Sequence, residues 1–224
     1  MNLLLPQWLQ TQMGYTATWA GLAAAPIGIL PVFLSPLVGR YANNFDLRLL
    51  AGLAFLAMAA TCFMRADFTT EVDYMHIALV QLFMGLGVAF FFMPILSILL
   101  SDLPPDQIAD GSGLATFLRT LAGSFAASLT TWIWNRRATM HHAYLTENIS
   151  QYDPATRATV EQLGGPGQHS AALLERMVES QSYMISTIDY FTLLGWLFLA
   201  MLVIICLAKP PFGAKPGAAA AGGH

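Results

Sequence analysis

The chain has 224 residues, of which 56% are hydrophobic and only 10% are charged, and its formal net charge is −3. A soluble domain carries about 25% charged residues, so this composition favours a membrane protein. The small net charge and the lack of a basic run argue against a nucleic-acid-binding protein.

The first residues, Met1–Gln12, are apolar but too short to cross a bilayer, which takes about 20 residues of helix. They lack the charged start and the small-residue cleavage site of a signal peptide. We therefore expect them to be the last part of a spanning helix whose beginning is missing. The chain would then be the C-terminal part of a larger protein.

Five long apolar stretches follow, and each approaches or exceeds the length that spans a bilayer as a helix. They are Thr16–Val38, Leu47–Met64, Met75–Leu100, Ala109–Trp134 and Ile188–Ala208. The predicted fold class is an all-α membrane protein, a helix bundle with five full transmembrane helices plus a partial N-terminal one. Three prolines predict that the first full helix is bent, either by packing kinks or as a moving gate: Pro26, Pro31 and Pro36.

The short loops predict the orientation, because lysine and arginine favour the cytoplasmic side. Gly39–Arg48 contains two arginines and is predicted to be cytoplasmic, whereas the acidic loop Arg65–Tyr74 is predicted to be external. Arginines in the long segment that follows Trp134 disagree with this orientation, but the charges of a segment that long count for less. The predicted domains are a transmembrane bundle over 1–134, an external (periplasmic) amphipathic segment over 135–187, the last transmembrane helix over 188–208 and a disordered cytoplasmic tail over 209–224.

The stretch at 75–100 places Gln81, Gly85 and Phe92 at helical spacing, so they share one face. Gly85 and Gly87 predict that another helix approaches closely, because small residues let two backbones come together. Gln81 fits an interhelical hydrogen bond and a contact in a cavity about equally well.

Arg119 lies about ten positions into the fourth stretch, which puts its Cα roughly 15 Å deep, near the bilayer midplane. An arginine there costs at least about 2.5–3.5 kcal/mol on insertion scales unless it meets water or a partner. It stands on a face of small or polar residues, so it is predicted to point at protein or water. That face comprises Ser112, Ala115, Thr116, Ala122, Gly123 and Ala126. A structural salt bridge or carbonyl contact and a role in a cavity or in coupling are both open.

The segment after Trp134 contains a predicted helix start at Asp153-Pro154 and helical spacing of apolar residues over Ala171–Ile185. That amphipathic helix either lies on the outer membrane interface or docks a partner protein. His141 and His142 are adjacent, so on a helix they point in different directions and do not predict a metal site. The spans hold no cluster of His, Cys, Asp or Glu, so no enzyme is predicted.

Long runs of this sequence resemble the major facilitator superfamily, and in particular the C-terminal half of its fourteen-helix, EmrB-type drug:proton antiporters. The runs are Leu5–Arg48, Phe90–Glu147 and AKPPFGA near the end. The resemblance implies a major facilitator C-terminal bundle that exports hydrophobic, drug-like compounds across the bacterial inner membrane by alternating access. It implies the proton gradient as the energy source, with no cofactor, and a periplasmic adaptor and an outer-membrane channel as partners. The alternative is a truncated, non-transporting assembly or interaction subunit.

The resemblance also implies that the N-terminal half is missing, and with it the acidic residue that carries the proton. Substrate sites in this superfamily lie between two halves near the midplane, so this chain would form one wall. The candidates for substrate binding or coupling are Arg119, Gln10, Gln81 and Phe92. A cytoplasmic gating loop is implied by the match of four residues to a degenerate copy of the superfamily's loop motif, although simple positive-inside anchoring also explains them: Gly39, Arg40, Asp46 and Arg48.

Overall fold

The computed structural model describes residues 4–41, 47–69, 72–100, 103–150 and 152–207. Within these ranges the chain is mostly helical and contains no β-strand. The helices in chain order are α1 (Leu4–Thr11), α2 (Ala17–Ala24), the 3₁₀ helix η1 (Ala25–Gly28), α3 (Ile29–Tyr41), α4 (Leu47–Ala66), α5 (Tyr74–Leu100), the 3₁₀ helix η3 (Pro105–Gln107), α6 (Ile108–Asn148), α7 (Pro154–Gln162) and α8 (Gln168–Leu207). The predicted disordered tail, 209–224, lies outside the described residues.

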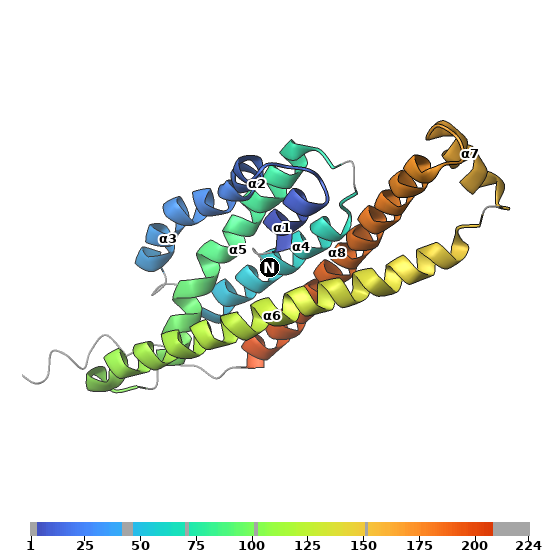
Figure 1. The fold of residues 1–224 in the computed structure, drawn as a ribbon. Helices are drawn as coiled ribbons and strands as arrows, with labels where there is room; N and C mark the ends of the chain where they lie inside the picture. The colour runs from blue at the N-terminus through green and yellow to red at the C-terminus, as the bar shows by residue number, and fades with distance from the viewer. Residues whose placement is uncertain (1–3, 42–46, 70–71, 101–102, 151, 208–224) are drawn as a thin grey trace, which may run out of the picture.

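The helices form a body from which two of them extend together (Figure 1). In the body, α4 packs against both α5 and α8, while η1 and α3 pack against α5. The long helix α6 packs mainly along α8. Beyond the body, α6 and α8 run on side by side, and α7 lies near their far end.

The first full apolar stretch is broken at Pro26, which lies in η1 between α2 and α3. Proline has no N–H to donate and its ring clashes with the preceding turn, so it kinks or breaks an α-helix. The prediction of a bent helix is therefore confirmed at this position. Pro36 lies inside α3, where the helix continues past it.

Four helical stretches in the described part of the chain are long and apolar enough to cross a membrane. They are 17–34, 48–66, 74–100 and a stretch within 168–207, and they correspond to four of the five predicted spans. The fifth predicted span, 109–134, is helical throughout as part of α6. It is less apolar than the other four, because it carries many small and hydroxyl side chains together with Arg119.

Glycines allow α5 to approach its neighbours closely, as predicted. A Cβ at Gly85 would lie 2.6 Å from the backbone oxygen of Ile27 in η1. A Cβ at Gly87 would lie 2.8 Å from the side chain of Met58 in α4. These two contacts bring α5 against η1 and α4 at nearly the same level of the bundle.

The segment predicted as a separate unit over 135–187 instead consists largely of extensions of the two longest helices. α6 continues through Trp134 to Asn148, and α8 begins at Gln168 and continues through Thr187. The residues expected to form a separate amphipathic helix belong to the N-terminal half of α8. Only α7 is an independent short helix, and it starts at the predicted cap, where the Asp153 side chain accepts a hydrogen bond from the Thr156 backbone N–H.

Candidate functional site

Arg119 and Phe92, two of the four predicted site residues, lie together where α6 passes α5. The guanidinium carbon of Arg119 is 5.6 Å from the centroid of the Phe92 ring. A guanidinium over an aromatic face at this distance is attracted by the ring quadrupole. Both side chains are exposed on the described chain, and Phe92 is 49% exposed. The pair therefore presents a cation and an aromatic ring on one open surface.

The face of α6 around Arg119 is open in the described structure. Thr116, Ala122 and Ala126 are exposed. A Cβ built at Gly123 would meet no other atom within 4 Å. The small side chains predicted to face protein or water thus leave room beside Arg119, and the described residues do not fill it.

Gln81 is buried and binds an arginine that the sequence analysis placed in a loop. Its Oε1 accepts a hydrogen bond from Nη2 of Arg65. The prediction that Arg65 opens the external loop is wrong, because α4 continues to Ala66 and Arg65 is 0% exposed in its last turn. The guanidinium can be buried there because Gln81 accepts from it and the Phe191 ring of α8 lies 5.3 Å away.

The remaining predicted site residues do not join either group. The Gln10 side chain is exposed, and its Nε2 donates to the Pro6 carbonyl one turn earlier in α1. In the predicted gating loop, Gly39 and Arg40 belong to the end of α3, but the Arg40 side chain and the whole of Asp46 lie outside the described part of the chain. Arg48 is in the first turn of α4 and is partly buried.

Sequence reasoning missed a polar seam between α6 and α8, because its partners are about 50 to 60 positions apart in sequence. Nε1 of Trp134 donates to Oγ1 of Thr187 over 2.9 Å, and the Ser186 hydroxyl donates to the Trp134 carbonyl over 2.6 Å. The hydroxyls of Thr130 and Tyr190 share a hydrogen bond of 2.7 Å. These contacts are buried, and together they fix the register of the two helices.

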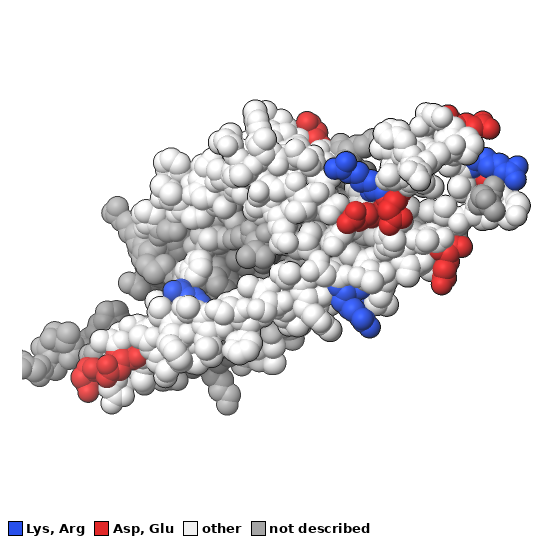
Figure 2. Space-filling view, viewed as in Figure 1, with Lys and Arg blue, Asp and Glu red and all other residues white. Residues whose placement is uncertain are grey.

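Charged pairs also connect α6 and α8. Asp189 accepts from Nε of Arg137 over 2.8 Å and contacts Nε2 of His141 over 2.7 Å. A further pair joins Nε2 of His142 to Glu175 over 2.9 Å. On the face shown in Figure 2, most of the charged side chains gather towards the end that carries α7. The extended part of α6 and α8 thus has the surface expected for contact with water.

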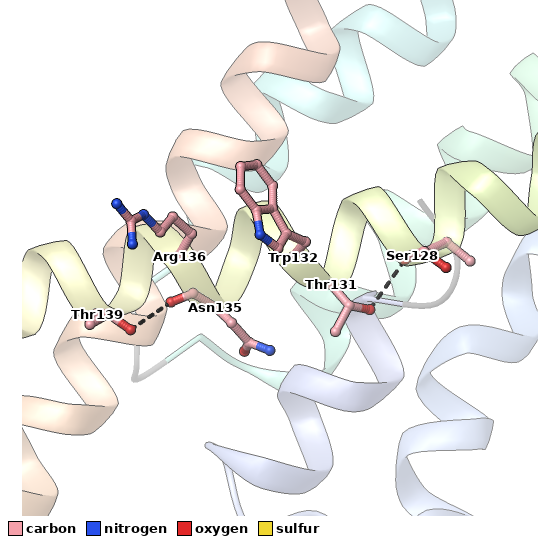
Figure 3. A pocket seen from close by; sticks show the side chains of 7 residues that line it. Ser128, Thr131, Trp132, Asn135, Arg136 and Thr139 are labelled. Carbon is pink, nitrogen blue, oxygen red and sulfur yellow. Dashed lines mark hydrogen bonds between the residues drawn. The ribbon is translucent and has the colours of Figure 1, made fainter.

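A hollow of about 660 Å³ lies along the exposed side of α6 (Figure 3). Its lining is mixed, with hydroxyl, amide and indole groups beside one guanidinium: Ala127, Ser128, Thr131, Trp132, Asn135, Arg136 and Thr139. None of the four predicted site residues lines it. Trp132 and Arg136 project from the same side of the helix, and Trp132 is 63% exposed.

These groups offer polar and aromatic contacts to a bound molecule. The described residues contain no group of three His, Cys, Asp or Glu side chains close enough to hold a metal ion. The pair of Arg119 and Phe92 can contact a hydrogen-bond acceptor and an apolar ring of the same molecule. The buried group around Arg65 joins three helices.

Comparison with known proteins gives consistent matches over most of the chain. Residues 1–127 match the model of the Major Facilitator Superfamily. The chain is similar to the multidrug export protein EmrB of Escherichia coli (strain K12), with 44% identity over 220 residues that cover 96% of this chain and 43% of that protein. It is similar to the fatty acid resistance protein FarB of Neisseria gonorrhoeae, with 41% identity over 96% of this chain and 43% of that protein. EmrB of Haemophilus influenzae is 42% identical over 95% of this chain and 42% of that protein. The chain therefore spans about two fifths of the length of these relatives, and no solved structure matches it significantly.

Proposed function

The chain belongs to the major facilitator superfamily and is a multi-pass protein of the bacterial inner membrane, and from this premise we propose that it forms the C-terminal part of a proton-driven multidrug efflux transporter. The observation that carries the proposal is the identity of 41–44% to export and resistance proteins along nearly the whole chain. Because those relatives are more than twice as long, transport is proposed for the complete protein and not for these residues alone.

The open face of α6 supports a substrate pathway built from two parts of the transporter. Alternating access needs a site enclosed from two sides, near the membrane midplane. Arg119 and Phe92 lie beside each other on an exposed surface of small residues, and the position of Arg119 about ten residues into its apolar stretch leads us to expect it near the midplane. We propose that they form one wall of the substrate pathway, and that the opposite wall and the proton-carrying acidic group come from the rest of the protein.

Hydrophobic, drug-like compounds are the proposed substrates. Aromatic rings and methionines tolerate ligands of varied shape, because they offer polarisable apolar surface without fixed hydrogen-bond geometry. Phe92 supplies such a surface next to a single cation. A periplasmic adaptor and an outer-membrane channel are the proposed partners, and the extension formed by α6, α7 and α8 is the proposed contact for the adaptor.

The experiment that tests this function is complementation in a bacterial strain that lacks related pumps. The complete gene that contains this chain is expressed there, and the inhibitory concentrations of several hydrophobic drugs are measured. The measurement is repeated with a protonophore present, at a concentration that still permits growth. We expect raised resistance to more than one compound, and loss of that resistance when the proton gradient is collapsed. Unchanged sensitivity, with the protein shown to be in the membrane, would contradict the proposal and favour a non-transporting assembly subunit.

A further inference from the structure

The side chains of Arg65, Gln81 and Phe191 form a buried junction between three helices, which we call the Arg65 junction. Arg65 comes from the last turn of α4, Gln81 from α5 and Phe191 from α8, and they are 0%, 1% and 0% exposed. Arg65 Nη2 donates to Gln81 Oε1, and the guanidinium carbon lies 5.3 Å from the Phe191 centroid. One side chain thus connects two helices that flank its own.

The junction is incompletely satisfied as it stands. A guanidinium carries five N–H donors, and within the described part of the chain Nε and Nη1 of Arg65 are buried without an acceptor. A charged donor removed from water without a partner is costly, so the closed arrangement gains less than its contacts suggest. If the helices part at this level, water reaches those donors. The junction therefore holds the helices together without making their separation prohibitively unfavourable.

Close packing next to the junction makes its opening measurable. Cys62, which forms no disulfide with another described residue, is 0% exposed and lies one turn before Arg65 on the same side of α4. Nearby, α4 and α8 approach closely, because a Cβ at Gly195 would lie 2.9 Å from the ring of Phe63. Any separation of these helices at the junction exposes the Cys62 thiol to a reagent in water.

We propose that Arg65 is a positioning residue of the transport cycle: through Gln81 and Phe191 it latches one end of the α4–α5–α8 group closed, and it releases when that end opens. This inference rests on the proposed function, because a latch matters only if the protein alternates between conformations. Each of the two states has its own stabilising interactions. The closed state has the Arg65–Gln81 hydrogen bond and the contact with the Phe191 ring, and the open state has hydration of the Arg65 donors.

The test measures the rate at which a hydrophilic maleimide labels Cys62 in membranes that contain the complete protein. Cys206, which is exposed, is replaced by alanine, and any cysteine outside this chain is also replaced. Gln81→Leu removes the acceptor and leaves Nη2 of Arg65 buried without its partner as well, so we expect labelling to become at least several-fold faster. Gln81→Glu offers Arg65 a carboxylate that accepts two hydrogen bonds and balances its charge, so we expect labelling to become several-fold slower. Arg136→Gln, which removes an exposed guanidinium from α6, is the matched control and should leave the rate unchanged.

One variant is expected to speed labelling and the other to slow it, so a general loss of folding cannot produce both results. If Gln81→Leu does not reach the membrane, Gln81→Glu alone decides, and labelling at or above the wild-type rate overturns the latch. Export is measured in parallel: a latch that must release predicts that Gln81→Glu slows export at normal abundance, whereas export at the wild-type rate would reduce the junction to a structural contact. Failure of the wild-type protein to export would overturn the proposed function, whatever the labelling shows.

Discussion

Trp134 of α6 and Thr187 of α8 are joined by a buried hydrogen bond of 2.9 Å, from the indole Nε1 to the threonine hydroxyl. The same threonine donates its own proton to the Tyr183 carbonyl one turn earlier. Its hydroxyl therefore donates within its own helix and accepts between helices. This contact lies in the middle of the polar seam that aligns the two longest helices.

Thr187→Val should destabilise the protein, because it leaves a buried indole N–H without an acceptor while keeping the shape of the side chain. The expected loss is about 1–2 kcal/mol of unfolding free energy. Thr192→Val is the matched control, since the hydrogen bond of Thr192 within the described part of the chain goes to the carbonyl of Ile188 in its own helix. Unfolding of the purified complete protein in detergent, followed by tryptophan fluorescence, gives both values. Equal effects of the two substitutions would refute the role assigned to the seam.

Gly85→Ala should destabilise the bundle because the added methyl group meets a backbone oxygen, which cannot rotate away. The Cβ would lie 2.6 Å from the Ile27 carbonyl oxygen, so η1 and α5 must move apart. We expect a cost of about 1–3 kcal/mol, measured as a lower temperature of aggregation in detergent extracts. Gly52→Ala is the control: no atom lies within 4 Å of its Cβ position, and alanine should be neutral or slightly stabilising there.

Asp189→Asn should weaken the charged part of the seam only modestly. Asp189 holds both Arg137 and His141, but the Arg137 side chain is 47% exposed, so water and salt screen the pair. We expect a loss below about 1 kcal/mol that shrinks further as salt is added. Thermal unfolding at low and high salt checks this. A large effect that is independent of salt would mean that the carboxylate is far less hydrated than its exposure indicates.

Arg119→Ala should abolish export by the complete protein while its abundance in the membrane stays normal, if Arg119 contacts substrate or couples transport. Phe92→Leu should reduce export by a smaller factor, because it removes the ring that faces the guanidinium but keeps an apolar side chain. Export of a fluorescent drug from loaded cells, normalised to protein on a blot, measures both. Loss of abundance instead of activity would assign Arg119 a structural role.

Hydropathy predicted α4 and α5 well, because both helices are apolar along nearly their whole length. The boundaries of α4 and α5 match the predicted stretches within two residues at each end, because loops and charged residues flank both. The proline-rich first span is interrupted at Pro26 but continues as a helix past Pro36, so the prolines predicted a bend without fixing which of them makes it. The close approaches at Gly85 and Gly87 were also predictable from the small residues.

The contacts between distant segments were not predictable in this way. Arg65 ends an apolar stretch and precedes an acidic loop, a context typical of a residue at the membrane surface, and its partners come from α5 and α8. The continuation of α6 and α8 beyond the apolar stretches was missed for a similar reason. An amphipathic helix has the same sequence pattern whether it lies on a membrane or pairs with another helix, and only the partner distinguishes the two.

Transport by the purified complete protein tests the central claim most directly. The protein that contains this chain is reconstituted into liposomes, a proton gradient is imposed, and movement of a fluorescent hydrophobic drug across the membrane is recorded. We expect the wild-type protein to move the drug only when the gradient is present, and the Arg119→Ala protein at the same density not to move it. Absence of gradient-dependent movement by correctly folded wild-type protein, with several chemically different drugs, would contradict the claim.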